Sequence, residues 1–474
     1  MALHTLSATA LAQSIRNQTV SAVAAVDACL AQIQSLDPQL KAFITLDIDR
    51  ARKAAIQADQ AVAADQPLGP LHGVPIAIKD LTATAGLRTT YGSPIFADHV
   101  PTQDESCVSR LRAAGAIVLG KTSTPEFGMG TGTTNPLVGT TLNPHDLSRT
   151  CGDSSGGSAV AVASGMVYLA QGTDMGGSVR TPASFCGIIG LRPALGRIAR
   201  VPKPLPWESL VSEGVLARTV EDAALMLSAM AGVDCRDPTA IAVERWLVPP
   251  FSQAPWPKMR LGYSENLGVT PVAAAVAEVF DQAVAAIAQV CPHIHRATID
   301  CTGAKAAFET LRAATVCHLY QPLWQAHRDR LSATVRWEIE QGLGITAADY
   351  LQAEEKRGQI LQNFLNFFVD HDVLLVPSAS VLPFPANQEA ILTIDGSHLE
   401  NVIDYLAITY TLSLTGFPIV SLPCGWTRSG LPVGMQIVGK PHGEAQLLQF
   451  AYYLQEQLGF RHRWPRPDVI EQNK

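Results

Sequence analysis

The sequence predicts an α/β fold, because strand-like and helix-like segments alternate along it. Three short apolar runs end in polar turns, as buried strands do, at residues 73–80, 115–122 and 187–193. Helical stretches lie between them, at 106–114 and 158–167. Alternation of this kind is typical of a sheet that is covered by helices.

The remaining elements follow in chain order. Residues 5–64 are predicted to be helical, with apolar side chains such as Val23, Val26 and Leu30 at helical spacing. Long helices, interrupted by turns, are expected over 272–290 and 304–368. Strand texture returns at 371–379, at 416–425 and around Gly434, and an amphipathic helix follows at 444–458. We therefore expect a single domain, 1–474, built from N-terminal helices (1–65), an α/β core (66–233 and 369–474) and a mostly helical middle lobe (234–368).

Composition limits the classes of partner. The chain has 474 residues, 47% of them apolar, and a formal net charge of −7. This charge disfavours nucleic acid and anionic membranes as partners. The N-terminus does not resemble a secretory signal, and no apolar run is long enough to cross a bilayer. Nine cysteines without a Cys-x-x-Cys pair predict free thiols in a reducing, cytoplasmic compartment and no metal site.

The stretch Gly152-Asp153-Ser154-Ser155-Gly156-Gly157 resembles the nucleophile motif of trypsin-like proteases. That interpretation needs an upstream histidine base and an orienting aspartate. Histidines do lie upstream, but the surroundings of His72, in Leu-His-Gly-Val-Pro, do not resemble those of such a base. The helix-rich texture also disagrees with a pair of β-barrels.

A second glycine-serine stretch, Gly172-Thr-Asp-Met-Gly-Gly-Ser-Val-Arg180, is more informative. Two glycines before Ser178 allow a sharp turn that exposes backbone N–H groups, as an oxyanion hole requires. Lys79 follows a buried-strand run, so that it stands at the end of a strand. A desolvated lysine can lose its proton near neutrality and act as a base, and Ser-Lys pairs replace histidine triads in several hydrolases.

Together these segments resemble the amidase signature family, whose members hydrolyse amides with a Ser-Ser-Lys triad. The matching stretches are HGVPIAIKD, GDSSGGSAVAVASG and GTDMGGSVRTPASFCGIIGLRPALGR, with further similarity in GKTSTPEFG, SEGVLARTVEDAA and GFPIVSLPCG. The resemblance runs from about residue 5 to residue 460. It implies a large mixed, twisted sheet with helices on both faces.

The resemblance also assigns roles by position. It implies that Ser178 is the nucleophile, Ser154 the bridging serine and Lys79 the base. It places the oxyanion hole at the backbone N–H groups of Met175, Gly176, Gly177 and Ser178. No metal or organic cofactor is implied, because the proton relay and the N–H donors suffice for acyl transfer.

The sequence departs from the family at Asp153, where the usual run is Gly-Gly-Ser-Ser. In the family the peptide bond before the bridging serine is cis. A carboxylate close to Lys79 would favour the protonated ammonium and oppose its function as a base. We therefore expect the Asp153 side chain to point away, into the loop or solvent; the alternative is a substitution that disturbs activity.

Supporting and pocket residues follow from the same comparison. Ser155 is expected either to support the triad by hydrogen bonds or to cap the following helix. Asp174 and Arg180 are expected to form a buried ion pair, with substrate binding by Arg180 as the alternative. Candidate substrate-binding residues, some of which could equally serve helix packing or face solvent, are Met129, Gly130, Tyr320, Trp324 and Arg357, with Phe308 and Leu319 as further pocket walls.

We therefore expect an amidohydrolase that cleaves the C–N bond of a small carboxamide through an acyl-Ser178 intermediate and releases ammonia or an amine. The alternative is an amidotransferase-type subunit, or an impaired scaffold with the same fold. Residues 306–332 lack the Tyr-Asp-Gly-x-Lys-Phe-Gly-Tyr-Arg segment usual in the tRNA-linked type, and no membrane-binding segment stands out. The expected partner is a small-molecule amide, and a homodimer stays open.

Overall fold

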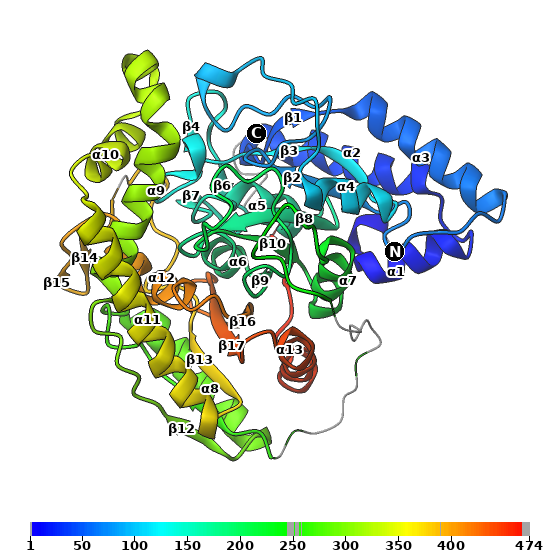
Figure 1. Ribbon diagram of the computed structural model, residues 1–474. Helices are drawn as coiled ribbons and strands as arrows, with labels where there is room; N and C mark the ends of the chain where they lie inside the picture. The colour runs from blue at the N-terminus through cyan, green and yellow to red at the C-terminus, as the bar shows by residue number, and fades with distance from the viewer. Residues whose placement is uncertain (1, 244–250, 252–255, 257, 389, 467–474) are drawn as a thin grey trace.

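One large mixed sheet dominates the computed structural model, which describes residues 2–243, 251, 256, 258–388 and 390–466 (Figure 1). Eleven strands of the described residues form it. In order across the sheet they are β1 (Phe43–Leu46), β3 (Ile117–Thr122), β2 (Pro75–Lys79), β8 (Leu169–Asp174), β10 (Ser212–Ala217), β9 (Ile189–Arg192), β16 (Ile419–Trp426), β17 (Pro432–Gly439), β13 (Val373–Pro377), β11 (Leu261–Tyr263) and β12 (Ile294–Arg296). The predicted α/β class and the mixed sheet are confirmed.

Strand direction determines where the polar ends of the central strands meet. Strand β2 runs parallel to both of its neighbours, β3 and β8. Ile78 pairs with Gln171, so that Lys79 ends β2 beside the last residues of β8. The sheet then continues through antiparallel pairs from β8 to β13. The carboxyl ends of β2 and β8 therefore lie side by side, and β8 leads into the glycine-rich loop that carries Ser178.

Helices cover the sheet and extend beyond it. They are α1 (Ala8–Arg16), α2 (Ala22–Leu40), α3 (Ile48–Ala63), α4 (Ser106–Ala113), α5 (Gly156–Ala163), α6 (Arg180–Cys186), α7 (Val220–Met230), α8 (Ala274–Val290), α9 (Ala304–His327), α10 (Ala333–Gly342), α11 (Ala347–Asp370), α12 (Ala407–Ser413) and α13 (Glu444–Leu458). Every residue of α5 and α6 is buried. These two short helices lie at the centre of the molecule, and each begins directly after a candidate catalytic serine loop.

The helical middle segment forms one side of the molecule. Helix α9 packs against α10 and α11, and Figure 1 shows these three helices at the edge opposite the N-terminal helices α1–α3. A capping box between Thr346 and Asp349 starts α11, because each residue's side chain binds the other's backbone N–H. Residues 244–250, 252–255 and 257 of the expected middle lobe lie outside the described residues.

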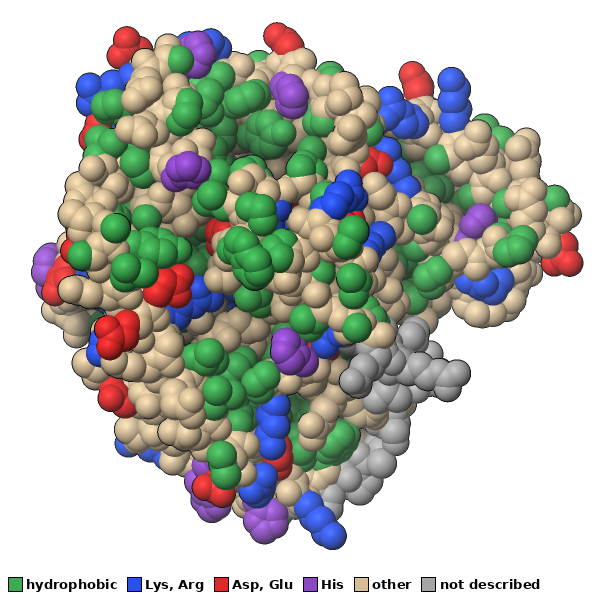
Figure 2. Space-filling view, viewed as in Figure 1, with side chains coloured by type: hydrophobic (Ala, Val, Ile, Leu, Met, Phe, Trp, Pro, Cys, Tyr) green, Lys and Arg blue, Asp and Glu red, His purple; other side chains and the backbone are tan. Residues whose placement is uncertain are grey.

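The described surface shows no large region of one charge on the face seen in Figure 2, where acidic and basic side chains are interspersed. None of the described helices is both long and apolar enough to cross a membrane. The core itself consists mainly of aliphatic side chains from the sheet and from α5, α7 and α13. The loops that carry Ser154 and Ser178 therefore adjoin a buried core.

Candidate active site

Lys79 lies at the buried end of β2, and its ammonium group contacts the first candidate serine. Its Nζ lies 2.7 Å from Ser154 Oγ and 2.9 Å from Thr173 Oγ1. Burial lowers the pKa of Lys79 to about 7, while the charges of Asp153, Asp174 and Glu213 work in the opposite direction. The structure thus brings Lys79 and Ser154 together as the sequence predicts, with the lysine poised to exchange a proton near neutrality.

The loop between β8 and α6 carries Ser178 and is shaped by Asp174. The Asp174 carboxylate accepts hydrogen bonds from the N–H groups of Gly177 (3.0 Å) and Val179 (3.1 Å). The expected buried ion pair with Arg180 is present, at 2.8 Å between Nη2 and Oδ1. Burial alone would raise the pKa of Asp174, but the charges of Arg180 and Arg192 outweigh it and hold the pKa well below its usual range.

Arg180 has no role at the cavity, in contrast to the alternative that it binds substrate. Its side chain is fully buried, and its remaining donors reach Thr409 O, Gln436 Oε1 and Ser413 Oγ. The sequence analysis missed the second cation on Asp174, Arg192, whose Nη1 lies 3.0 Å from Oδ1. An arginine inside the apolar run 187–193 was the available signal, because a buried charge requires a partner.

Three of the four expected oxyanion donors have no recorded acceptor. Among the described residues, no hydrogen-bond partner is recorded for the backbone N–H of Met175, Gly176 or Ser178. The prediction for the fourth donor, Gly177, is wrong. Its N–H donates a hydrogen bond to the Asp174 carboxylate, so it holds the turn and does not face a reacting oxygen. Gly177 has φ of +133°, and a Cβ there would lie 2.5 Å from Thr409 Oγ1. Only glycine fits this position, so the turn that presents Ser178 depends on it.

Ser155 supports the two loops and does not cap α5. Its Oγ donates to Thr173 O at 3.2 Å and accepts from Thr173 N at 3.3 Å, while its own N–H binds Ser178 O at 3.2 Å. Its side chain makes no capping hydrogen bond to the helix that it precedes. Of the two expectations for Ser155, the supporting one therefore agrees with the structure.

Asp153 contradicts the expectation that its carboxylate points into the loop or solvent. The residue is only 4% exposed, lines the cavity beside the two serines, and accepts the Ser154 N–H at 2.8 Å. The bond between Asp153 and Ser154 is trans, since the one cis peptide bond of the described residues joins Val201 to Pro202. The expected cis bond is therefore also wrong. A trans bond avoids the cost of a non-proline cis bond, which is about 3–4 kcal/mol.

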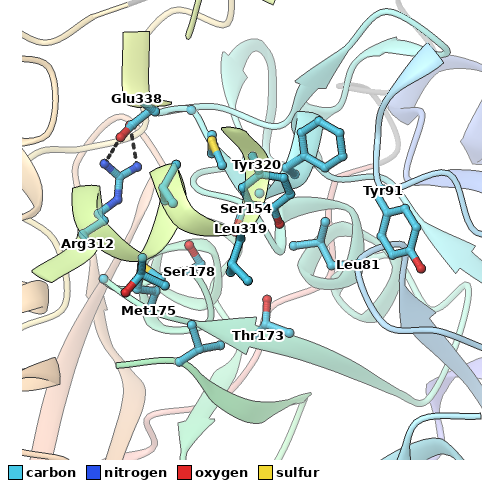
Figure 3. Close-up of a pocket in the computed structure, with 18 of the residues that line it drawn as sticks. Leu81, Tyr91, Ser154, Thr173, Met175, Ser178, Arg312, Leu319, Tyr320 and Glu338 are labelled. Atoms are coloured by element: carbon cyan, nitrogen blue, oxygen red, sulfur yellow. Dashed lines mark hydrogen bonds and ion pairs between the residues drawn. The ribbon is translucent and has the colours of Figure 1, made fainter. Parts of the chain in front are cut away.

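A cavity of about 740 Å³ opens above these groups. Ser154, Ser178 and Met175 line its floor, and Leu319 and Tyr320 reach it from α9, as Figure 3 shows. Met129, Gly130 and Phe308 line it as well, so these expected pocket residues do face the cavity. A cavity of this size suits a small organic molecule.

Two expected pocket residues lie elsewhere. Arg357 binds Leu414 O through Nε (2.9 Å) and Ser209 Oγ through Nη1 (2.7 Å), so it joins α11 to two loops instead of meeting substrate. Trp324 is not among the cavity residues, and its ring lies under the Arg328 guanidinium, 4.9 Å from the ring centroid. The proline at position 322 separates it from Tyr320 on α9.

Sequence analysis also missed several charged residues around the cavity. Arg312 of α9 and Glu338 of α10 form an ion pair at its rim (Figure 3). On another wall, burial raises the pKa of Glu105 to about 8, and the charge of Glu213 acts in the same direction. Arg200 pairs with Glu208 and Glu213. No sequence signal identified these residues, because their partners are distant along the chain.

The described residues contain no group of three His, Cys, Asp or Glu side chains that could hold a metal ion. The chemistry that the site can perform with its own groups is nucleophilic attack by a serine, with proton transfer through Ser154 and Lys79. Among the described residues, no hydrogen bond is recorded between the hydroxyls of Ser154 and Ser178. Catalytic hydrogen bonds often tighten only when substrate is present.

Comparison with known proteins points to one family. The profile of the Amidase family matches residues 24–448. An acylamidase of Rhodococcus erythropolis is 34% identical over 95% of this chain and 94% of that protein. The A-type subunit of the glutamyl-tRNA(Gln) amidotransferase of Geotalea daltonii is 33% identical over 98% of this chain and 99% of that protein. Among solved structures, a bacterial aryl acylamidase has a TM-score of 0.89 at 25% identity, covering 99% of this chain and 98% of that one. A 6-aminohexanoate cyclic dimer hydrolase has a TM-score of 0.87 at 26% identity, covering 99% and 100%.

Proposed function

This chain belongs to the amidase family, and from this premise we propose that Ser178 attacks the carbonyl carbon of a small carboxamide and forms an acyl-enzyme. The protein is an amidase, which hydrolyses C–N bonds in amides. The observation that carries the proposal is the buried contact of 2.7 Å between Lys79 Nζ and Ser154 Oγ, at the floor of the cavity that Ser178 also lines. A lysine with a lowered pKa beside a serine is the arrangement that a Ser-Lys hydrolase needs.

In the proposed acylation, Ser154 accepts the proton of the Ser178 hydroxyl and passes its own proton to neutral Lys79. The Ser178 oxygen bonds to the carbonyl carbon, and the carbonyl electron pair moves to its oxygen. Backbone N–H groups of Met175, Gly176 and Ser178 stabilise that oxyanion. When the tetrahedral intermediate collapses, the C–N bond breaks and the proton returns through Ser154 to the leaving nitrogen. Water then releases the acid by the same relay.

The cavity supports a substrate with an apolar and a polar part. Phe308, Leu319 and Tyr320 supply an apolar wall from α9, whereas Glu105 and Arg200 supply a polar wall. The volume of about 740 Å³ is sufficient for a small carboxamide with either an aliphatic chain or a ring as its acyl group.

We also propose a cytoplasmic location, supported by nine unpaired cysteines of which only Cys235 is exposed.

The test is a panel of small amides with ammonia or amine release as the readout, together with labelling by a fluorophosphonate probe. We expect wild type to hydrolyse at least one amide and to be labelled, and Ser178→Ala to lose both. Ser164→Ala is a matched control, because the buried Ser164 hydroxyl has no hydrogen-bond partner among the described residues. Hydrolysis that persists in Ser178→Ala would refute the proposed nucleophile. A wild-type protein that is neither active nor labelled would favour the scaffold.

A further inference from the structure

Asp153 occupies a position that the mechanism above does not use. One carboxylate oxygen accepts the Ser154 N–H at 2.8 Å, and the nearby Ser178 hydroxyl acts to lower the pKa of the same carboxylate. The side chain is almost completely buried, yet it lines the cavity beside both serines. Asp153 therefore lies beside Ser178 in the cavity, whereas Ser154 contacts Lys79.

The charged and titratable groups around Asp153 come from three elements. They are Lys79 at the end of β2, Asp174 at the end of β8 and Tyr405 in the 3₁₀-helix η5 (Asp404–Leu406). Asp174 is already neutralised by two arginines, and Tyr405 donates its hydroxyl to Thr131 O at 3.2 Å. Lys79 is thus the cation whose charge lowers the pKa of Asp153 most.

Among the described residues, Asp153 forms no salt bridge with Lys79 that would hold the lysine in its protonated form. The ion pairs of the described residues do not include Lys79 with Asp153, and the Lys79 ammonium instead contacts Ser154 Oγ and both oxygens of Thr173. The Asp153 carboxylate lines the same cavity as Ser154 and Ser178. Lys79 thus contacts the hydroxyl of Ser154, while Asp153 lies beside Ser178.

We propose that Asp153 is a second proton acceptor of the Ser178 nucleophile, and that it works with Lys79 as a pair that holds one proton before the attack and two after it. This inference rests on the proposed function, in which Ser178 is the nucleophile.

The pair provides an acceptor in either of its one-proton states. When Lys79 carries the proton, the Ser178 O–H bond breaks toward the Asp153 carboxylate as the Ser178 oxygen bonds to the carbonyl carbon. When Asp153 carries it, the Ser178 proton passes through Ser154 to Lys79. On collapse of the intermediate the C–N bond breaks, and the group that gained the proton returns it to the leaving nitrogen. In deacylation, the pair accepts a proton from water while the resulting hydroxide bonds to the acyl carbon. When the bond between the acyl carbon and the Ser178 oxygen breaks, that proton passes to the Ser178 oxygen, so the pair again holds one proton.

The titration of the two groups agrees with this geometry. Burial raises the pKa of Asp153 to about 6, against the opposing charge of Lys79. Burial lowers the pKa of Lys79 to about 7, against the opposing charge of Asp153. Two interacting groups with such close values titrate as a pair, so a single proton can lie on either one. A glycine at position 153, usual in the family, would leave Lys79 as the one acceptor.

The experiment measures kcat and kcat/KM of the full chain with an amide that wild type hydrolyses. We use Asp153→Asn, which keeps the shape and accepts hydrogen bonds but not protons, and Asp153→Gly, which restores the family's usual residue. Since general-base catalysis contributes about 10²–10⁴-fold, we expect both variants to lose activity on that order. Asp146→Asn is the matched control, because Asp146 is a partly exposed carboxylate on β7 (Asp146–Thr150) away from the cavity, and we expect its kcat to be unchanged.

The outcomes separate this inference from the proposed function. Unchanged or higher kcat in either Asp153 variant, with Ser178→Ala inactive, would overturn the inference and leave the nucleophile in place. A gain in Asp153→Gly would further identify the aspartate as a disturbance. If Ser178→Ala stays active, the proposed function fails, and the inference fails with it. Melting temperatures and fluorophosphonate labelling of the two Asp153 variants verify that any loss of rate occurs in folded protein.

Discussion

Replacement of Asp174 by asparagine tests how the nucleophile loop is held. The carboxylate has no exposed surface and receives two backbone N–H groups and two guanidinium groups, from Arg180 and Arg192. Asn keeps the shape but removes the negative charge, so that both buried guanidinium groups lose the carboxylate with which they form ion pairs. Removal of one partner of a buried ion pair costs about 3–5 kcal/mol. Unfolding entropy of about 2.1 cal/mol/K per residue gives roughly 1 kcal/mol/K for the whole chain, so the expected fall in Tm is about 3–5 °C.

The assay is thermal unfolding of wild type and Asp174→Asn at one fixed scan rate. Asp27→Asn is the control, since Asp27 pairs with Arg52 at the surface, where both side chains are about half exposed. Exposed pairs contribute about 0–1 kcal/mol, so the control should shift Tm by less than about 1 °C. If Asp174→Asn also shifts Tm by less than about 1 °C, the carboxylate is not the charge that compensates the two arginines, and this account of the loop is wrong.

Three further predictions concern pH, the cavity and α11. A Lys79–Asp153 pair that already holds two protons cannot accept a third one. We therefore expect kcat/KM to fall about tenfold per pH unit below roughly pH 6, where the Asp153 carboxylate is protonated as well as Lys79. A fall that starts near pH 7 would instead indicate that Lys79 acts alone. Tyr320→Ala should raise KM about tenfold because it removes part of the apolar wall, whereas Trp324→Ala, outside the cavity, should leave KM within twofold; equal effects would contradict the assigned wall. Arg357→Ala should lower Tm by a few degrees without changing KM more than twofold, because its guanidinium joins loops and not substrate; a tenfold rise in KM would restore its predicted binding role.

Local signals in the sequence marked Lys79 and the two serine turns, and the family resemblance placed Lys79 and Ser154 together. Lys79 directly follows an apolar run, which marks it as the end of a buried strand, and the glycines after Ser154 and before Ser178 mark sharp turns. Strand β8, which pairs with β2 and leads into the Ser178 loop, was not predicted as a strand. Its sequence, Leu-Ala-Gln-Gly-Thr-Asp, lacks β-branched residues except Thr173, and it is a strand because it pairs with β2 and β10 on either side.

Side-chain direction on a helix could not be predicted from spacing alone. Tyr320 and Trp324 lie one turn apart on α9, and both were predicted as candidate pocket residues, with helix packing as the alternative. Tyr320 lines the cavity, whereas Trp324, two residues beyond the proline inside α9, packs on Arg328. The direction of the Arg357 side chain could not be predicted either, because a long arginine side chain can extend in several directions from a helix. Its hydrogen-bond acceptors, Leu414 O and Ser209 Oγ, lie in loops that are distant in sequence.

The two aspartates near Ser178 show why burial alone does not define a role. Both carboxylates are buried, and burial raises the pKa of each. At Asp174 two guanidinium groups reverse that effect, so its charge is fixed, balanced and available only to hold the loop. At Asp153 the nearest cation is Lys79, which is not in ion-pair contact and itself titrates, so the carboxylate can exchange a proton in the range where the lysine does. Opposite pKa shifts of neighbouring carboxylates mark a division between a structural and a proton-transfer role, and here that division separates the residue that shapes the turn from the one that faces the nucleophile.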